Sequence, residues 1–93
     1  MLVSLACLAA CGTNPPVQEM SDARQAIAVA RDAGASELAP LDLRAAEDFL
    51  DSALRNLSKK SYQQARTDAI EAKNKALAAL ATAEAAGQAN PRP

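Results

Sequence analysis

Apolar residues recur with helical spacing along most of the chain and predict three helices. The first is expected at about residues 17–33, where Met20, Ala23, Ile27 and Ala30 follow one another at intervals of three and four residues. Gly34 comes next, and glycine is the usual residue where a helix ends in a left-handed conformation. Residues 35–39 are expected to form a turn.

The second helix is predicted over residues 40–59. It opens at Pro40, a residue favoured in the first helical turn, and Asp42 follows where the helix dipole favours an anion. Its apolar stripe consists of Leu43, Ala46, Leu50, Ala53 and Leu57, with Leu54 beside them. The opposite side carries Arg44, Glu47, Asp48, Asp51 and Arg55, which is typical of a solvated helix face.

The third helix is predicted over residues 61–86, between the capping residue Ser61 and Gly87. An alanine seam follows Tyr62 and consists of Ala65, Ala69, Ala72, Ala76, Ala79, Ala83 and Ala86. Ile70, Leu77 and Leu80 run beside the seam and broaden its apolar face. The fold class is therefore all-α, an antiparallel three-helix bundle whose third helix extends past the other two.

The alanine seam has three interpretations. It packs against the other two helices of the chain, because small side chains let a neighbouring helix approach closely. Alternatively, its last turns, from Ala76 to Ala86, pack against another copy or another protein, because too few residues remain in the chain to cover them. Part of the pattern also follows from composition, since alanine forms helix readily and accounts for 24 of the 93 residues.

The N-terminal region differs from the rest in charge. Residues 1–18 carry no acidic or basic side chain, whereas all ten basic and eleven acidic residues lie between Glu19 and Arg92. Residues 1–10 have the length and composition of the apolar part of a signal peptide. They are too few to span a bilayer, which takes about 20 residues. A signal peptide normally begins with Lys or Arg, so we expect that translation starts upstream or that the sequence is truncated.

Leu8, Ala9, Ala10 and Cys11, followed by Gly12, resemble the lipobox of bacterial lipoproteins. The resemblance implies cleavage before Cys11, a diacylglyceryl group on its thiol and an acyl chain on its new amino group, which together give stable anchoring. Cys7 fits less well because Ser4 occupies the position where the motif has Leu. The alternative is that Cys7 and Cys11 are buried thiols, or a disulfide, in an apolar helix.

The lipobox resemblance also places the domain relative to the membrane. Gly12 is not the Asp that signals inner-membrane retention in enteric-type bacteria, so the analogy implies the outer membrane, facing the periplasm. Residues 11–16 end in Pro15 and Pro16 and form a tether of about 15 Å. The helical domain is expected at residues 17–87 and a disordered tail at residues 88–93.

Composition argues against an enzyme. The chain has no His and therefore lacks both the side chain that titrates near neutral pH and the commonest metal ligand. It shows no nucleophile paired with a base, no glycine-rich phosphate loop and no metal-ligand spacing. The formal net charge of -1 disfavours nucleic-acid binding. We expect no catalytic residue, metal, cofactor or small-molecule substrate.

Several segments resemble a known family. They are Ala23-x-x-Ala26-x-x-x-Ala30, Gly34-Ala35-x-x-x-Ala39-Pro40-x-x-Leu43, and Tyr62-x-x-Ala65-x-x-x-Ala69-x-x-Ala72. They resemble domain of unknown function 4398, found in periplasmic and lipoprotein sequences of Gram-negative bacteria, over about residues 17–83. The resemblance implies a compartment and an architecture but no activity.

Two functional hypotheses remain. The first is a non-enzymatic, outer-membrane-anchored lipoprotein that acts as a structural or adaptor helical module for an envelope protein or for another copy of itself. The alternative is a pilotin- or chaperone-like lipoprotein that binds a client helix in an apolar groove. The sequence does not identify a particular partner.

Overall fold

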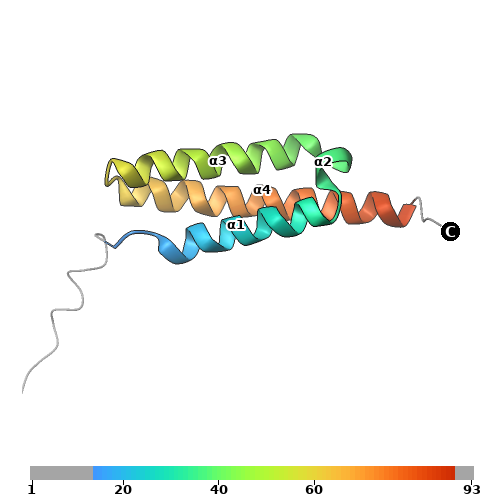
Figure 1. The fold of residues 1–93 in the computed structure, drawn as a ribbon, viewed down its shortest axis with the longest axis horizontal. Helices are drawn as coiled ribbons and strands as arrows, with labels where there is room; N and C mark the ends of the chain where they lie inside the picture. Colours follow the sequence, from blue (N-terminus) through green and yellow to red (C-terminus); the bar gives the residue numbers. More distant parts are fainter. Residues whose placement is uncertain (1–13, 90–93) are drawn as a thin grey trace, which may run out of the picture.

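The computed structural model describes residues 14–89, which form three long helices and one short one (Figure 1). These are α1 (Val17–Asp32), α2 (Ala35–Leu38), α3 (Pro40–Ser58) and α4 (Tyr62–Ala89). Helices α1 and α4 run in the same direction, and α3 runs opposite to both (Figure 1). The all-helical fold predicted from the sequence is confirmed for the described residues.

Most helix ends lie close to their predicted positions. Gly34 has the left-handed φ of 91° expected after α1, and its N–H donates to the carbonyl of Arg31 at 2.9 Å. Pro40 begins α3 as predicted. At the start of α4, the Ser61 carbonyl accepts the N–H of Ala65 at 2.9 Å, so Ser61 precedes the helix. The helix ends at Gly34 and Pro40 therefore follow the local chemistry of glycine and proline, whereas the bond at Ser61 is made by its backbone carbonyl.

The prediction of only three helices was wrong, because residues 35–39 contain one further helical turn, α2. The Leu38 and Ala39 N–H groups donate to the carbonyls of Gly34 and Ala35 at 3.0 and 2.9 Å. This turn buries Ala35 and Ala39 in the core. A segment of four residues is too short to show an apolar period, so the pattern gave no signal for it.

The predicted end of the last helix at residue 86 was also wrong. Helix α4 continues through Gly87 to Ala89, so Gln88 and Ala89 belong to the helix rather than to the tail assigned from sequence. Gly34 is the one glycine of the described region with a positive φ. Glycine lowers helix propensity but keeps its backbone N–H, so it does not stop a helix that neighbouring residues favour. Residues 90–93 lie outside the described residues.

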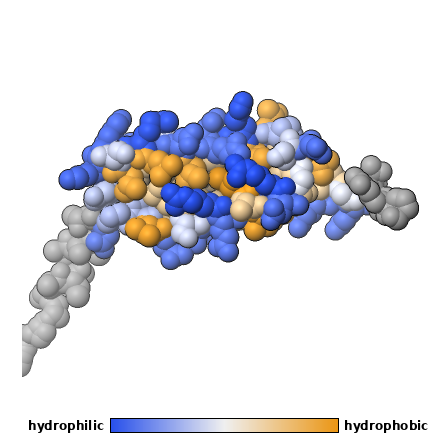
Figure 2. Space-filling model, in the orientation of Figure 1, coloured by the Kyte–Doolittle hydropathy of each residue, from blue (hydrophilic) through white to orange (hydrophobic). Residues whose placement is uncertain are grey.

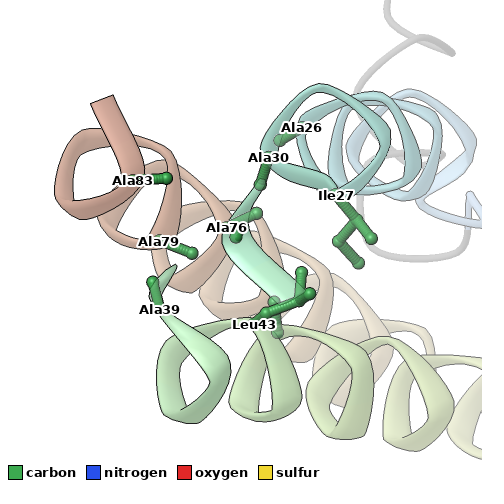
Figure 3. Packing of buried hydrophobic residues seen from close by; sticks show 10 residues of the cluster. Ala26, Ile27, Ala30, Ala39, Leu43, Ala76, Ala79 and Ala83 are labelled. Carbon is green, nitrogen blue, oxygen red and sulfur yellow. The ribbon is translucent and has the colours of Figure 1, made fainter. Parts of the chain in front are cut away.

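The core is built mainly from alanine. Its larger cluster, close to α2, consists of Ala26, Ile27, Ala30, Ala35, Ala39, Leu43, Ala46, Ala76, Ala79 and Ala83. Ile27 from α1 and Leu43 from α3 point into the space between the long helices (Figure 3). A smaller cluster joins Met20, Ala53 and Ala69, with Leu57 against it. The buried residues predicted for α1 are all in the core.

Residues 14–16 pack against the helices. Pro16 is fully buried. Arg66 of α4 donates from Nη2 to the carbonyl of Asn14 at 3.2 Å, and its Nε lies 3.4 Å from Oε2 of Glu19 in α1. The last part of the segment assigned from sequence as a tether therefore belongs to the folded domain.

Candidate interaction surfaces

The lipobox residues Leu8, Ala9, Ala10 and Cys11 lie outside the described residues, as does Cys7. Acylation at Cys11 therefore stays a prediction. The described chain begins at Asn14, where Arg66 holds the backbone. This contact places the start of the described chain beside the first turns of α1 and α4.

The alanine seam of α4 is enclosed by the rest of the chain. Its members Ala65, Ala69, Ala72, Ala76, Ala79 and Ala83 have only 0–1% of their surface exposed, and Tyr62 at the start is half-buried. Ala76, Ala79 and Ala83 share a cluster with residues of α1, α2 and α3. The chain itself therefore covers these turns as far as Ala83, whereas Ala86, the last residue of the seam, is only partly buried. The seam is a helix-packing face within the chain.

A carboxylate lies at the boundary between α3 and α4. Asp68 is 8% exposed, and its Oδ2 accepts hydrogen bonds from Ser52 Oγ at 2.6 Å and from Asn56 Nδ2 at 2.8 Å. Both donors come from α3, so the carboxylate links the two helices. Sequence reasoning missed this group, although Asp68 stands three residues after Ala65 on the buried face.

An ion pair crosses the gap between α1 and α3. A cleft of about 410 Å³ there is lined by Arg24, Ile27, Arg31, Glu47, Leu50 and Asp51. Arg31 Nη2 lies 2.6 Å from Glu47 Oε2 across it. In the view of Figure 2, apolar residues form a band along the bundle and hydrophilic side chains project across it.

Within residues 14–89, no group of three His, Cys, Asp or Glu side chains is placed to hold a metal ion.

A second, more apolar groove lies between α1 and α4. It has a volume of about 310 Å³ and is lined by Asp22, Gln25, Ala26, Val29, Lys73, Leu77 and Leu80. Val29 and Leu77 are each 44% exposed, and Ile70 on the same helix as Leu77 is 43% exposed. The sequence placed Ile70 and Leu77 beside the seam but could not show that they remain outside the core.

A family comparison covers almost the whole described fold. The family described as "Domain of unknown function (DUF4398)" matches residues 18–90. The chain belongs to the DUF4398 family. No curated protein and no solved structure matches the chain. The DUF4398 match includes all but the first residue of α1 and all of α2, α3 and α4. None of the helices in the described part of this DUF4398 chain is both long and apolar enough to cross a bilayer.

Proposed function

We propose that this protein is a lipid-anchored, non-enzymatic adaptor of the cell envelope in a Gram-negative bacterium. The diacylglyceryl and N-acyl chains on Cys11 hold its helical domain at the periplasmic face of the outer membrane. The observation that carries the proposal is the sequence from Leu8 to Gly12, which resembles a lipobox and stands immediately before the folded domain.

The packing of residues 14–16 supports a short connection to the membrane. Because Pro16 is buried and Asn14 is bound by Arg66, only the residues between Cys11 and Asn14 are available as a tether. From the Cα of Cys11 to the Cα of Asn14 there are three residue steps, which span at most about 11 Å. The proposed anchor therefore keeps one end of the bundle next to the lipid headgroups, so the domain meets its partners at the membrane surface.

Charge at that end of the bundle also supports the proposal. The turn between α3 and α4 lies at the same end as the start of α1 (Figure 1). Lys59 and Lys60 in this turn are both exposed, and they form the longest basic run of the chain. Lysines close to a bilayer are attracted to anionic phospholipids. Lys59 and Lys60 would hold the domain against the surface to which Cys11 anchors it.

An adaptor role fits the surfaces of the described domain. The seam alanines are enclosed, and the Arg31–Glu47 pair bridges the cleft between α1 and α3. The groove between α1 and α4 is one surface on which large apolar side chains remain exposed beside polar ones, and the exposed Leu41 lines another at the start of α3. We assign contact with an envelope protein or with another copy of the chain to α1 and α4, because Val29 and Leu77 are exposed there from two helices.

The second candidate is a pilotin- or chaperone-like lipoprotein. The exposed Val29 and Leu77 favour it, because a client helix docks by placing apolar side chains into such a groove. Binding of a hydrophobic dye to the wild-type protein, together with loss of that binding in Leu77→Gln, would support a client groove. The exposed Leu54→Gln on α3 is the matched control and should leave dye binding unchanged.

The anchoring claim is tested by expressing the gene with its natural leader and separating membrane from periplasm. We expect Cys11→Ser to abolish labelling by radioactive palmitate and to move the protein to the soluble periplasm. Cys7→Ser is the matched control and should keep both label and membrane association. Membrane association and labelling that persist in Cys11→Ser would overturn the proposal.

A further inference from the structure

Beside the alanine seam, α4 carries a second stripe, which is largely exposed except for Leu80, a half-buried residue packed against the larger core cluster. The α4 outer stripe consists of Ile70, Lys73, Leu77, Leu80, Glu84 and Gly87, spaced alternately by three and four residues. This spacing places all six on one face of the helix. Lys73, Glu84 and Gly87 are exposed, and Ile70 and Leu77 expose more than two fifths of their surface.

The two charged residues of the outer stripe, Lys73 and Glu84, form no ion pair within the described chain, although Asp22 lines the same groove as Lys73. Lys73 stands on the N-terminal side of Leu77 and Leu80, and Glu84 stands on their C-terminal side. Neither Lys73 nor Glu84 has an oppositely charged residue three or four positions away. Neither forms an ion pair with any residue from 14 to 89. The stripe therefore has an apolar centre, Leu77 and Leu80, with a positive charge on one side of it and a negative charge on the other.

Gly87 is the second observation that points to a partner. It lies inside α4, where glycine lowers helix stability relative to alanine. A Cβ atom at this position would meet nothing within 4 Å, so packing among the described residues gives no reason for glycine. Close approach of another chain is a general reason for glycine on a helix surface.

We propose that two copies of this chain associate through their α4 outer stripes in antiparallel orientation. A two-fold axis between Ala78 and Ala79 sets Leu77 of each copy opposite Leu80 of the other. The same axis sets Lys73 opposite the other copy's Glu84 and Ile70 opposite its Gly87. This single register joins the apolar centres and pairs the opposite charges. It also places Ile70, at one end of the stripe, against the other copy's Gly87.

A parallel arrangement does not achieve this pairing. It would bring Lys73 close to the second copy's Lys73, and Glu84 close to its Glu84, and like charges at a contact are unfavourable. On α1, Ala26 and Val29 line the same groove as Leu77 and Leu80 and extend the apolar contact. Asp22 on that wall accepts a hydrogen bond from Gln18 at 2.9 Å and forms no ion pair with Lys73.

The contact should be weak in dilute solution and stronger on a membrane. One stripe of six residues offers less area than the roughly 800 Å² that each partner buries in a stable complex. Confining both copies to one surface raises their effective concentration. Only this strengthening at a membrane depends on the proposed function; the dimer itself does not. The antiparallel dimer would then lie along the membrane, because its two lipid-bearing ends point in opposite directions.

The test is a charge exchange in the full chain, secreted with its natural leader. All samples carry Cys7→Ser and Cys11→Ser so that neither lipid nor disulfide formation contributes to association. Sedimentation velocity over a concentration series measures the dimer fraction of the parent, Lys73→Glu, Glu84→Lys, and an equal mixture of these two variants. Far-UV circular dichroism confirms that each sample is folded.

We expect a concentration-dependent dimer for the parent and roughly tenfold or more weaker dimerisation for each variant alone, because like charges then face each other. The mixture should recover the parent's dimer fraction, since a mixed pair has opposite charges at both ends. A parent that stays monomeric at millimolar concentration overturns the proposal. Single variants that dimerise like the parent, or a mixture that stays monomeric, overturn it as well.

Gly87→Leu supplies an independent check that involves no charge. The new side chain meets open space within the described chain, so helicity should be unchanged while dimerisation weakens. Equal dimerisation of Gly87→Leu and the parent would contradict the register. Because every sample lacks the acylated cysteine, the outcome is independent of whether Cys11 carries lipid in the cell.

Discussion

The two faces of α4 differ in a way that reverses the usual relation between size and burial. On its inner face the small alanines of the seam are almost completely buried, whereas on its outer face the much larger Ile70 and Leu77 are about 43–44% exposed. Alanine lets α1 and α3 approach α4 closely, which leaves little room for larger side chains between them. Burial along α4 therefore follows the closeness of the neighbouring helices rather than the hydrophobicity of each side chain.

The largest effect is expected at the seam. Ala79→Glu places a carboxylate where the alanine is completely buried, and an unpaired buried charge costs several kcal/mol, enough to unfold a small domain. Ala78→Glu is the matched control, because Ala78 is exposed on the same turn and surface changes stay within about 0.5 kcal/mol. Urea unfolding followed by circular dichroism compares them, and equal midpoints would contradict the inward orientation of the seam.

A smaller effect is expected where a polar group interrupts the inner face. Asp68→Ala leaves Ser52 and Asn56 without their acceptor, which should cost about 1–3 kcal/mol of unfolding free energy. Asp68→Asn keeps a carbonyl oxygen as acceptor and should lose less. Both values come from the same urea titration. An Asp68→Ala protein as stable as the wild type would show that the network contributes nothing.

Substituting alanine for each of the two glycines near helix ends should change the free energy of unfolding in opposite directions. Gly34→Ala forces a Cβ into a left-handed conformation and should cost about 1 kcal/mol. Gly87→Ala on the outer face meets open space inside a helix and should gain a few tenths of a kcal/mol, since alanine is the better helix former. Thermal unfolding of both variants checks the signs. A loss of stability at Gly87 would mean that the helix does not continue as described.

The smallest effect is expected at the ion pair that joins the helices on either side of the seam. Glu47→Gln removes the charge that faces Arg31, and a solvated pair contributes about 0.5 kcal/mol or less. Glu37→Gln is an exposed control on α2. The difference between the two variants should shrink further in high salt. A loss of more than about 2 kcal/mol at Glu47 would show that the pair fixes the helix spacing.

The sequence predicts the inner face of the bundle well. Met20, Ala23, Ile27 and Ala30 form the buried stripe of α1 as their spacing indicates, because an amphipathic helix buries its apolar side. The family resemblance is confirmed by the match to DUF4398. These features depend on local spacing, which a single sequence displays directly.

Other features depend on which helices meet, and local spacing does not contain that information. Leu77 belongs to the broad apolar side of α4, but its exposure is decided by how α1 and α3 sit on the seam. The donors to Asp68 come from a different helix. The single turn of α2 is too short to have a period, and Gly87 occurs near a helix end where glycine commonly stops the helix.

The lipid anchor and the groove also differ in whether one continuous stretch of sequence reveals them. The lipobox resemblance at Leu8–Cys11 is a linear motif and can be found without any structure. The groove between α1 and α4 combines residues about 50 positions apart, such as Val29 and Leu77, and emerges only when the helices are packed. The sequence leaves Ala76, Ala79 and Ala83 open as a partner face, and their burial is the reason that we propose the outer stripe instead.

Acylation of Cys11 is tested most directly by mass spectrometry of the N-terminal peptide of the mature protein from membranes. We expect a peptide that begins at Cys11, with a thioether-linked diacylglyceryl group and an amide-linked acyl chain. A mature protein that begins at another residue, or that carries an unmodified Cys11, would contradict the lipid anchor and with it the proposed envelope function.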